Sequence, residues 1–180
     1  MGSPTRAVMS GGRRLDRPRD FGKRTGDAGM KATPGQHALI VLGWREWIGL
    51  PELGLPALKA KVDTGARTSA LHAFGIEKLP GARVRFRIHP NQNDDADEVV
   101  AEAAMIDERV VRTSGGHSEL RPVIRTTVRM GRLDLPVELT LSNRALLGFR
   151  MLLGREAIRG RFVIDPQRSY CRGEPRRGKR

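Results

Sequence analysis

An aspartate followed by threonine, glycine and alanine, at residues 63–66, constrains the fold of this chain more than any other feature. The preceding residues 58–62 lean apolar, which predicts a buried strand that delivers Asp63 to a loop. Because Asp and Gly both disfavour strands, that loop presents its first polar side chain at a fixed, partly buried point. Small neighbours would let a second polypeptide segment come close. A D-T-G tripeptide alone also fits an ordinary turn at the end of a strand. The rest of the chain must therefore show whether this aspartate is functional.

Composition divides the chain into a folded middle and two basic ends. Residues 1–36 are rich in Gly, Arg, Asp and Pro and show no periodicity, so we interpret them as a disordered basic tail. Residues 37–166 carry the strand-like runs and are long enough for one domain with a sizeable core. Residues 167–180 are interpreted as a basic C-terminal tail.

The net charge of +13 comes mainly from those ends. Residues 1–36 hold 8 Lys and Arg against 3 acids, residues 166–180 hold 6 against 1, and the middle holds 19 against 16. Basic tails of this kind can attach loosely to RNA, ribosomes or anionic lipid. With one Tyr and two Trp, the sequence shows no evident stacking platform for reading RNA.

Several classes of protein are excluded by what the sequence lacks. A single cysteine, Cys171, excludes a disulfide framework and a cysteine-based zinc site and makes a reducing cytoplasm the default location. No run approaches the roughly 18 apolar residues of a membrane span, and the basic N-terminus has no apolar signal segment. No P-loop pattern supports intrinsic ATP use. We expect a cytoplasmic protein with no membrane association and no cofactor.

Short runs with strand patterning fill the middle of the chain. Residues 84–88 alternate apolar and basic side chains, the period of a half-buried strand. Residues 38–42 predict a buried strand, and residues 44–54 predict an edge or loop that covers the core. Only residues 155–159, closed by Gly160, predict a helical turn. Further strands are expected at residues 58–62, 99–112, 120–130, 133–141, 151–154 and 162–164. The sequence therefore predicts an all-β barrel or sandwich with one short C-terminal helix.

Two further segments accompany the aspartate loop in a fixed order. Gly115 and Gly116 separate two long strand runs, which predicts a hairpin tip, because glycine adopts positive φ without steric cost. Residues 152–155 then read Leu-Leu-Gly-Arg. Together these features resemble the retropepsin-like aspartic proteases over residues 37–166. The resemblance implies a closed barrel, a glycine-rich flap over the substrate, and an apolar pair that holds the aspartate loop from behind.

The resemblance also implies roles for individual residues. Asp63, Thr64 and Gly65 take the place of the catalytic signature. Residues expected at the substrate are the small and basic side chains near that signature, the flap and the second signature, namely Ala66, Arg67, Gly115, Gly116, Arg121 and Arg155. No metal ligand is expected.

Residues 60–72, 119–124 and 151–158 resemble more closely a bacterial family labelled ATP-dependent zinc proteases. Its members are often associated with ATP-grasp ligases that add glutamates to a ribosomal protein or other acceptors, which implies a peptide or protein substrate that is itself glutamate-modified. Zinc hydrolysis needs about three protein ligands, commonly with paired histidines. The four histidines here are well separated, so the aspartic mechanism is the better interpretation.

One aspartate loop is only half of an aspartic protease site. Two carboxylates about 3 Å apart share one proton, one acting as base on water and the other as acid on the substrate carbonyl. Asp165 and Asp107 do not repeat the loop context. A second copy must supply the other half, which predicts a twofold homodimer with its site on the axis.

Arg67 departs from the retroviral pattern, in which the equivalent place holds an acid. An arginine there cannot pair with Arg155, so it must find a carboxylate, either Glu156 or Glu119 in the same chain or one on the substrate. Both alternatives remain open from sequence. Two alternatives to a homodimeric aspartic endopeptidase also remain: a non-catalytic barrel that binds peptides or a ribosome-associated partner, and a zinc-dependent protease.

Overall fold

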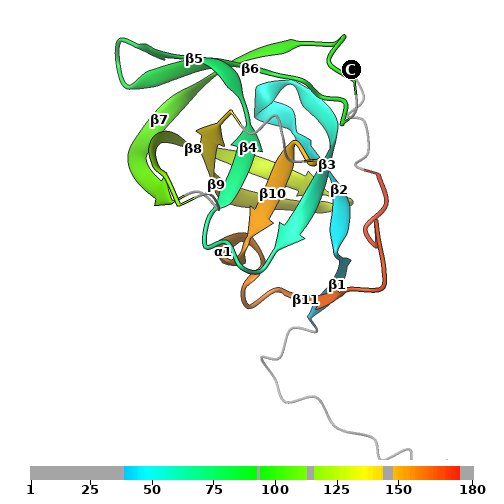
Figure 1. The fold of residues 1–180 in the computed structure, drawn as a ribbon. Helices are drawn as coiled ribbons and strands as arrows, with labels where there is room; N and C mark the ends of the chain where they lie inside the picture. Colours follow the sequence, from blue (N-terminus) through cyan, green and yellow to red (C-terminus); the bar gives the residue numbers. More distant parts are fainter. Residues whose placement is uncertain (1–38, 93, 113–115, 144–147, 175–180) are drawn as a thin grey trace, which may run out of the picture. The chain divides into compact units, whose positions relative to one another are not determined.

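The computed structural model describes residues 39–92, 94–112, 116–143 and 148–174. Its elements follow as β1 (Ile40–Gly43), β2 (Arg45–Leu50), a 3-10 turn η1 (Pro51–Leu53), β3 (Leu55–Asp63), β4 (Ser69–His72), β5 (Phe74–Leu79), β6 (Arg83–Ile88), β7 (Val99–Arg112), β8 (Ser118–Met130), β9 (Leu133–Ser142), β10 (Met151–Gly154), α1 (Arg155–Ile158) and β11 (Phe162–Asp165). The predicted all-β class with one short helix is confirmed (Figure 1). No helix in these described ranges is long and apolar enough to cross a membrane.

Nine of the strands form one sheet in the order β2-β3-β10-β4-β9-β8-β7-β6-β5. An additional pairing, Gly49 opposite Arg129, joins β2 to β8 and so bends the sheet back on itself. The remaining strands, β1 and β11, pair in parallel as a separate small sheet. This curvature encloses a core of fully buried side chains that includes Phe86, Leu58 and Leu139.

Strand β10 is inserted between two segments that lie close together in the sequence. It runs parallel to β3, with Leu153 beside Val62, and antiparallel to β4, with Met151 beside Leu71. Figure 1 shows β10 between β3 and β4, directly above α1. All four of its residues are buried. Strand β10, from the C-terminal part of the chain, therefore separates β3 from β4 and fixes the positions of these two strands, which flank residues 63–69.

Period-two patterning explains the strands that the sequence predicts well. In β6 every second residue is buried, so Val84, Phe86 and Ile88 enter the core while the arginines between them face outward. The long strands β7 and β8 form the predicted hairpin, in register from Arg112 opposite Ser118. Gly116 is exposed near the tip with φ 84°, as a turn requires, whereas Gly115 lies outside the described residues.

Sequence and structure differ at three places. For residues 44–54 the sequence predicted an edge or a loop that covers the core, and the structure shows residues 45–50 as strand β2, at one end of the sheet order and paired with β3 by backbone hydrogen bonds. The strand at residues 38–42 is not buried throughout: Leu39 and Val41 are exposed, because only one face of the small sheet packs on the core. Two strands, β4 and β5, were not assigned as such from the sequence.

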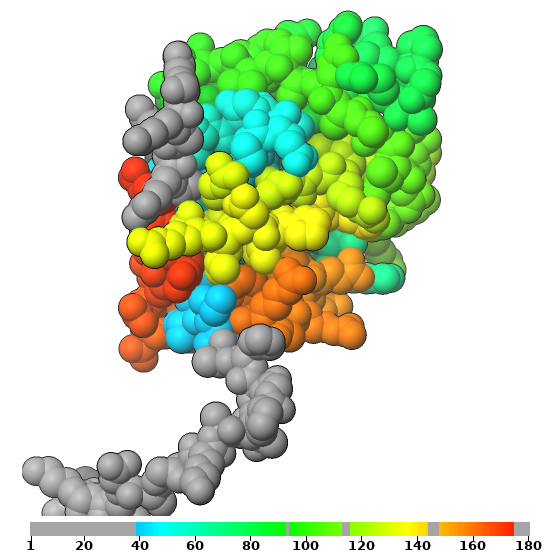
Figure 2. Space-filling view, turned by 180° about the vertical axis from the view of Figure 1, so that it is seen from behind, coloured from blue at the N-terminus to red at the C-terminus, as the bar shows by residue number. Residues whose placement is uncertain are grey.

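The described chain stays in contact with the fold beyond the predicted boundary at residue 166. Tyr170 N donates to Arg45 O at 2.8 Å, and Trp44 N donates to Arg168 O at 3.0 Å, so residues 168–170 run along β2. The buried Glu46 carboxylate accepts from Cys171 N at 3.0 Å and from Arg172 N. Figures 1 and 2 both show this C-terminal segment (red) beside the first strands.

Candidate functional site

The carboxylate of Asp63 is fixed by its own loop. Asp63 is the last residue of β3 and is half-buried, and its Oδ1 accepts from Gly65 N at 3.0 Å and from Ala66 N at 3.1 Å. These bonds form because a short carboxylate side chain reaches the backbone two and three residues ahead. The other oxygen, Oδ2, has no hydrogen-bond partner in the described part of the chain. The loop thus orients one face of the carboxylate and leaves the other for a ligand.

Arg155 clamps the same loop from outside. Its Nη1 donates to Thr64 O at 2.9 Å and to Gly65 O at 2.8 Å. Both acceptors belong to the peptide units that follow the aspartate, so the guanidinium holds the backbone of the D-T-G segment in place. Arg155 binds the loop that carries Asp63 through Nη1, and its expected contact with substrate stays a prediction.

Strand β10 and helix α1 hold the second half of the loop. Gly154 lies beside Asp63 in the sheet, and its N–H donates to Ser69 Oγ at 3.0 Å. Arg155 N then donates to Ala66 O at 2.9 Å, and Glu156 N donates to Arg67 O at 3.1 Å. The apolar pair of residues 152–153 therefore sits behind the aspartate loop as the resemblance implies.

Gly154 is required by this packing and not by its backbone angles. Its φ of −78° is open to any residue, but a Cβ at this position would lie 2.5 Å from the carbonyl carbon and oxygen of Thr68 and 2.9 Å from Arg67 O. Only a residue without a side chain lets β10 approach the loop this closely.

Two cavities flank the aspartate loop. One, of about 320 Å³, is lined by Arg67 and Ser69 from the loop, by Glu156 and Ala157 from α1, and by the strand residues Arg109, Pro136, Val137 and Glu138. The other, of about 590 Å³, is lined by the charged residues Arg67, Arg155, Glu156 and Arg159 and has an apolar wall of Ile158, Phe162 and Ile164 beside Thr64. The first is ionic and the second largely apolar.

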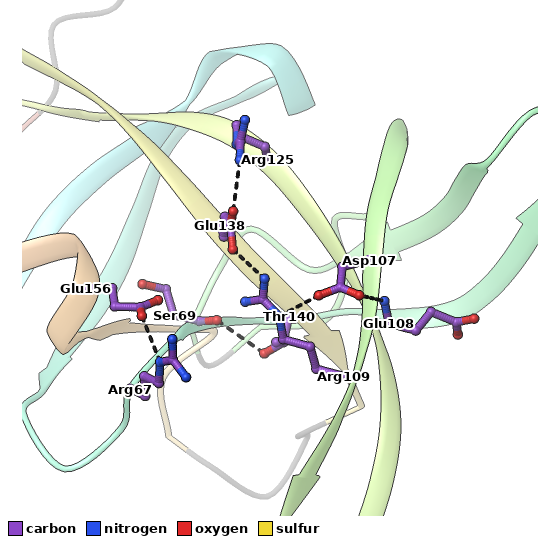
Figure 3. Close-up of polar contacts among 9 residues, drawn as sticks. All are labelled: Arg67, Ser69, Asp107, Glu108, Arg109, Arg125, Glu138, Thr140 and Glu156. Carbon is purple, nitrogen blue, oxygen red and sulfur yellow. Dashed lines mark hydrogen bonds and ion pairs between the residues drawn. The ribbon is translucent and has the colours of Figure 1, made fainter.

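Arg67 is paired within its own chain. Its Nε lies 2.8 Å from Glu156 Oε1, one of the two internal partners that the sequence left open (Figure 3). The two side chains remain 79% and 45% exposed, so water screens the pair and it contributes at most about 1 kcal/mol to stability. The terminal nitrogens of Arg67 have no ion-pair partner among the residues described.

A chain of ion pairs connects the base of the predicted flap to β9. Arg109 Nη2 lies 2.7 Å from Glu138 Oε2 and Arg109 Nε lies 2.8 Å from Asp107 Oδ2, while Arg125 binds the other oxygen of Glu138 at 3.0 Å (Figure 3). Hydrogen bonds from Arg109 and Arg125 lower the pKa of Glu138, and the Arg109 bond lowers that of Asp107. These carboxylates therefore stay charged in mildly acidic solution.

The geometry agrees with the model of one protein family. That model, described as RimB-like, "Retropepsin-like aspartic endopeptidase RimB", matches residues 41–175. The chain belongs to the RimB-like family. Its Asp63 loop, the strand behind it and the glycine-tipped hairpin all fall inside the matched range.

Curated relatives of this RimB-like chain carry a different name. A probable alpha-L-glutamate ligase of Parasynechococcus marenigrum is 46% identical over 140 residues, and ligases of the same name from Desulfotalea psychrophila and Shewanella pealeana are 45% and 44% identical. The alignments cover 76%, 74% and 75% of this chain. The chain spans only 30% of the length of each relative, so most of each ligase lies outside the similarity.

A solved structure supports the fold of this RimB-like domain. A Legionella pneumophila protein of unknown function aligns with a TM-score of 0.62 over 74% of this chain and 98% of its own length. At 24% sequence identity, this likeness concerns the fold alone.

Not every residue expected at the substrate lies at the RimB-like loop. Arg121 is buried in β8, where its guanidinium binds Glu119 at 2.8 Å, so a substrate carboxylate would have to displace Glu119. Conversely, sequence analysis missed Ser69, Arg109 and Glu138. Their positions depend on pairing between distant strands, and no local motif indicates them.

The donor set of this RimB-like site does not suit zinc. Within the described ranges, no three His, Cys, Asp or Glu side chains lie close enough together to hold a metal ion. His37 lies outside those ranges. The histidines of β4 and of the loop after β6, His72 and His89, stack instead on either side of Phe74, with ring centroids 6.2 and 4.5 Å from it.

Proposed function

We propose that this protein is a homodimeric aspartic endopeptidase whose site is completed by Asp63 from two copies. The observation that carries the proposal is the doubly held Asp63 carboxylate at the end of a buried strand, fixed by Arg155 and by β10. Here one oxygen orients the group and the other is open to a reacting water.

The reaction follows from placing two such carboxylates together. The pair shares one proton, because two adjacent negative charges cannot both persist in a confined site. The ionised Asp63 takes a proton from the attacking water, and the protonated Asp63 of the second copy gives its proton to the carbonyl oxygen. Collapse of the tetrahedral intermediate then transfers a proton to the leaving amine and separates the two peptide products.

One feature supports a second copy on the Asp63 side. Ile158, Phe162 and Ile164 form an apolar wall of the cavity that Thr64 also lines. A dimer that covered this wall would bring two aspartate loops together and remove apolar surface from water at roughly 25 cal/mol per Å². In this proposal each copy is a retropepsin-like closed barrel.

For the substrate we propose acidic or glutamate-tailed peptides. Arg67 lines both cavities beside the aspartate loop, and its terminal nitrogens can take a carboxylate while Nε keeps Glu156. The names of the curated relatives support a functional association with an ATP-grasp glutamate ligase, because each relative carries a RimB-like segment within a longer ligase chain.

Asp63→Asn tests the mechanism. The variant keeps the loop's shape but cannot share a proton, so cleavage of an acidic peptide should fall by several orders of magnitude with the melting temperature unchanged. Adding an excess of Asp63→Asn to wild type should place most wild-type chains in heterodimers with one competent aspartate and lower the activity per wild-type chain. Asp134→Asn, the same change at an exposed aspartate of β9, is the matched control.

Dilution and chelation test the alternatives. Activity of a dimer should fall faster than linearly on dilution, alongside the dimer fraction measured by light scattering. Full activity in a monomeric sample would refute the two-copy site. Loss of activity with a chelator, restored by zinc, would favour a metal-dependent protease, and peptide binding that survives Asp63→Asn without any cleavage by wild type would favour a binding module.

A further inference from the structure

The outer face of the β2–β3 pair carries cations without acidic partners. Arg45 lies opposite Lys61, and Trp47 lies opposite Lys59, in the antiparallel register. Directly opposed residues share one face of a sheet, as do residues two apart along a strand. Arg45, Trp47, Lys59 and Lys61 therefore form one surface, here named the β2–β3 face; the next residue on the same side of β3 is Asp63, where the strand ends.

Unpaired cations also occur elsewhere on the described surface, as at Arg112, Arg132, Arg159 and Arg161, whereas nine arginines lie within 4 Å of a carboxylate, at positions 67, 83, 85, 87, 109, 121, 125, 129 and 150. What sets the β2–β3 face apart is that its cations lie opposite one another in the register of two strands and among aromatic rings. Neither Arg45, Lys59 nor Lys61 has an ion pair within the described ranges. Like charges directly opposite each other, as at Arg45 and Lys61, destabilise a strand pair. An anion placed across this face would remove that repulsion.

Aromatic rings lie among these cations. Arg45 Cζ is 4.5 Å from the centroid of Trp44 and 5.0 Å from that of Tyr170, and Lys59 Nζ is 5.1 Å from that of Trp47. The rings of Trp47 and Tyr170 are 5.7 Å apart. Both tryptophans and the single tyrosine of the chain are thus gathered here, each partly exposed. In a chain with 4% aromatic residues, that concentration is not needed for the core.

The C-terminal segment is bent to complete the surface. Tyr170 has φ 56°, a left-handed conformation that costs a residue with a side chain roughly 1–2 kcal/mol, and this conformation places its ring against Arg45 and Trp47. Two residues later, Arg172 Nε is buried with no hydrogen-bond partner in the described residues. The sequence that follows adds four further basic residues at positions 176, 177, 179 and 180.

We propose that the β2–β3 face and the C-terminal segment bind single-stranded nucleic acid. The unpaired cations would contact successive phosphates, and bases would stack on the exposed parts of Trp47 and Tyr170. The aromatic rings favour this ligand over an acidic peptide, which has no planes to stack. The flat, cation-lined strand pair favours it over a membrane, which would require protruding apolar side chains.

Fluorescence anisotropy with labelled U15 and dT15 tests the proposal on the full chain. Arg45→Gln/Lys59→Gln/Lys61→Gln should weaken binding at least tenfold at 0.1 M salt and lower the slope of log K against log salt by about 2, since each single-strand phosphate contact contributes about 0.7. Trp47→Leu should weaken binding by roughly tenfold while changing the slope little, because stacking is insensitive to salt.

The matched control removes the same number of charges from ion pairs. Arg83→Gln/Arg85→Gln/Arg125→Gln gives the same net charge and should bind as the wild type does, apart from a small general electrostatic effect. Lys61→Glu, at an exposed residue, replaces the triple variant if the triple variant has a lowered melting temperature. Comparing the affinities for U15 and dT15 shows whether the face prefers RNA or DNA.

Three outcomes would overturn the proposal. The first is absence of binding by the wild type. The second is equal weakening by the control and by the β2–β3 variant, which would assign binding to the basic ends alone. The third is tighter binding to poly-glutamate or to vesicles containing phosphatidylglycerol than to either oligonucleotide, which would assign this face to an acidic protein or to a lipid surface.

Discussion

Replacing Gly154 by alanine should disable the aspartate loop without touching any charged group. The new Cβ would stand 2.5 Å from the Thr68 carbonyl, closer than real Cβ contacts allow, and the neighbour is backbone that cannot rotate away. Because the φ of Gly154 suits alanine, the whole penalty is steric. Overpacking of this kind costs about 1–3 kcal/mol. In a domain of this size the melting temperature should fall by roughly 3–12 °C.

The loss of activity should exceed the loss of stability. To relieve the contact, residues 66–69 must move away from β10, which lengthens the bond from Gly154 N to Ser69 Oγ and those from the α1 backbone to Ala66 O and Arg67 O. Bringing the 2.5 Å contact to an ordinary distance needs a shift approaching 1 Å, which misplaces Asp63 relative to its counterpart in the proposed dimer. A displacement of about 1 Å can cost on the order of a hundredfold in rate.

A second glycine provides the control. Gly148 has no atom within 4 Å of a Cβ built on it, so Gly148→Ala should leave activity unchanged and keep or slightly raise the melting temperature. Thermal melts and peptide cleavage on both variants complete the test. If Gly154→Ala retains wild-type activity and stability, β10 does not hold the loop as tightly as described, and the reasoning fails.

Three further predictions concern single side chains. Glu46→Gln should lower the free energy of unfolding by about 1–3 kcal/mol, because it leaves a buried N–H without its acceptor. Residues 168–172 should then become accessible to protease, and unchanged proteolysis would contradict this prediction. Burial lowers the pKa of His72 in the folded state, so the unfolded chain binds a proton at this histidine more readily. The free energy of unfolding should therefore fall as the pH drops below 6.5. Urea titrations of His72→Gln at the same pH values should lack that fall. Arg67→Ala should reduce kcat/KM on glutamate-rich peptides by roughly thirtyfold more than on neutral ones, with little change in melting temperature, and equal losses would mean that Arg67 does not contact substrate.

Local chemistry made the aspartate loop predictable from sequence. The Asp63 carboxylate bonds to the backbone of residues 65 and 66, and the strand that delivers it is marked by its own apolar run. The alternation of basic and apolar residues in β6 likewise predicts which of its side chains are buried, without reference to other strands. The helical turn at α1 ends before Gly160, whose φ of 76° matches its expected role.

Features that depend on distant partners were not predictable. Residues 45–50 looked like a loop because Glu46 interrupts the apolar pattern, yet its carboxylate is satisfied by backbone N–H groups more than 120 residues away. Arg109 and Glu138 meet only because β7, β8 and β9 lie side by side. The cation-lined face of β2 and β3 needs the cross-strand register, which no local pattern specifies.

The insertion of β10 between β3 and β4 dictates when the candidate site can exist. During synthesis, residues 55–72 leave the ribosome some 80 residues before their partner at 151–154, so the gap that β10 fills must stay open until nearly the whole domain has emerged. Pairings of such long sequence separation form slowly. An incomplete chain, or one cut before residue 151, would carry Asp63 on an unsupported loop. If the protein is the proposed protease, its activity begins only after the domain has been completed.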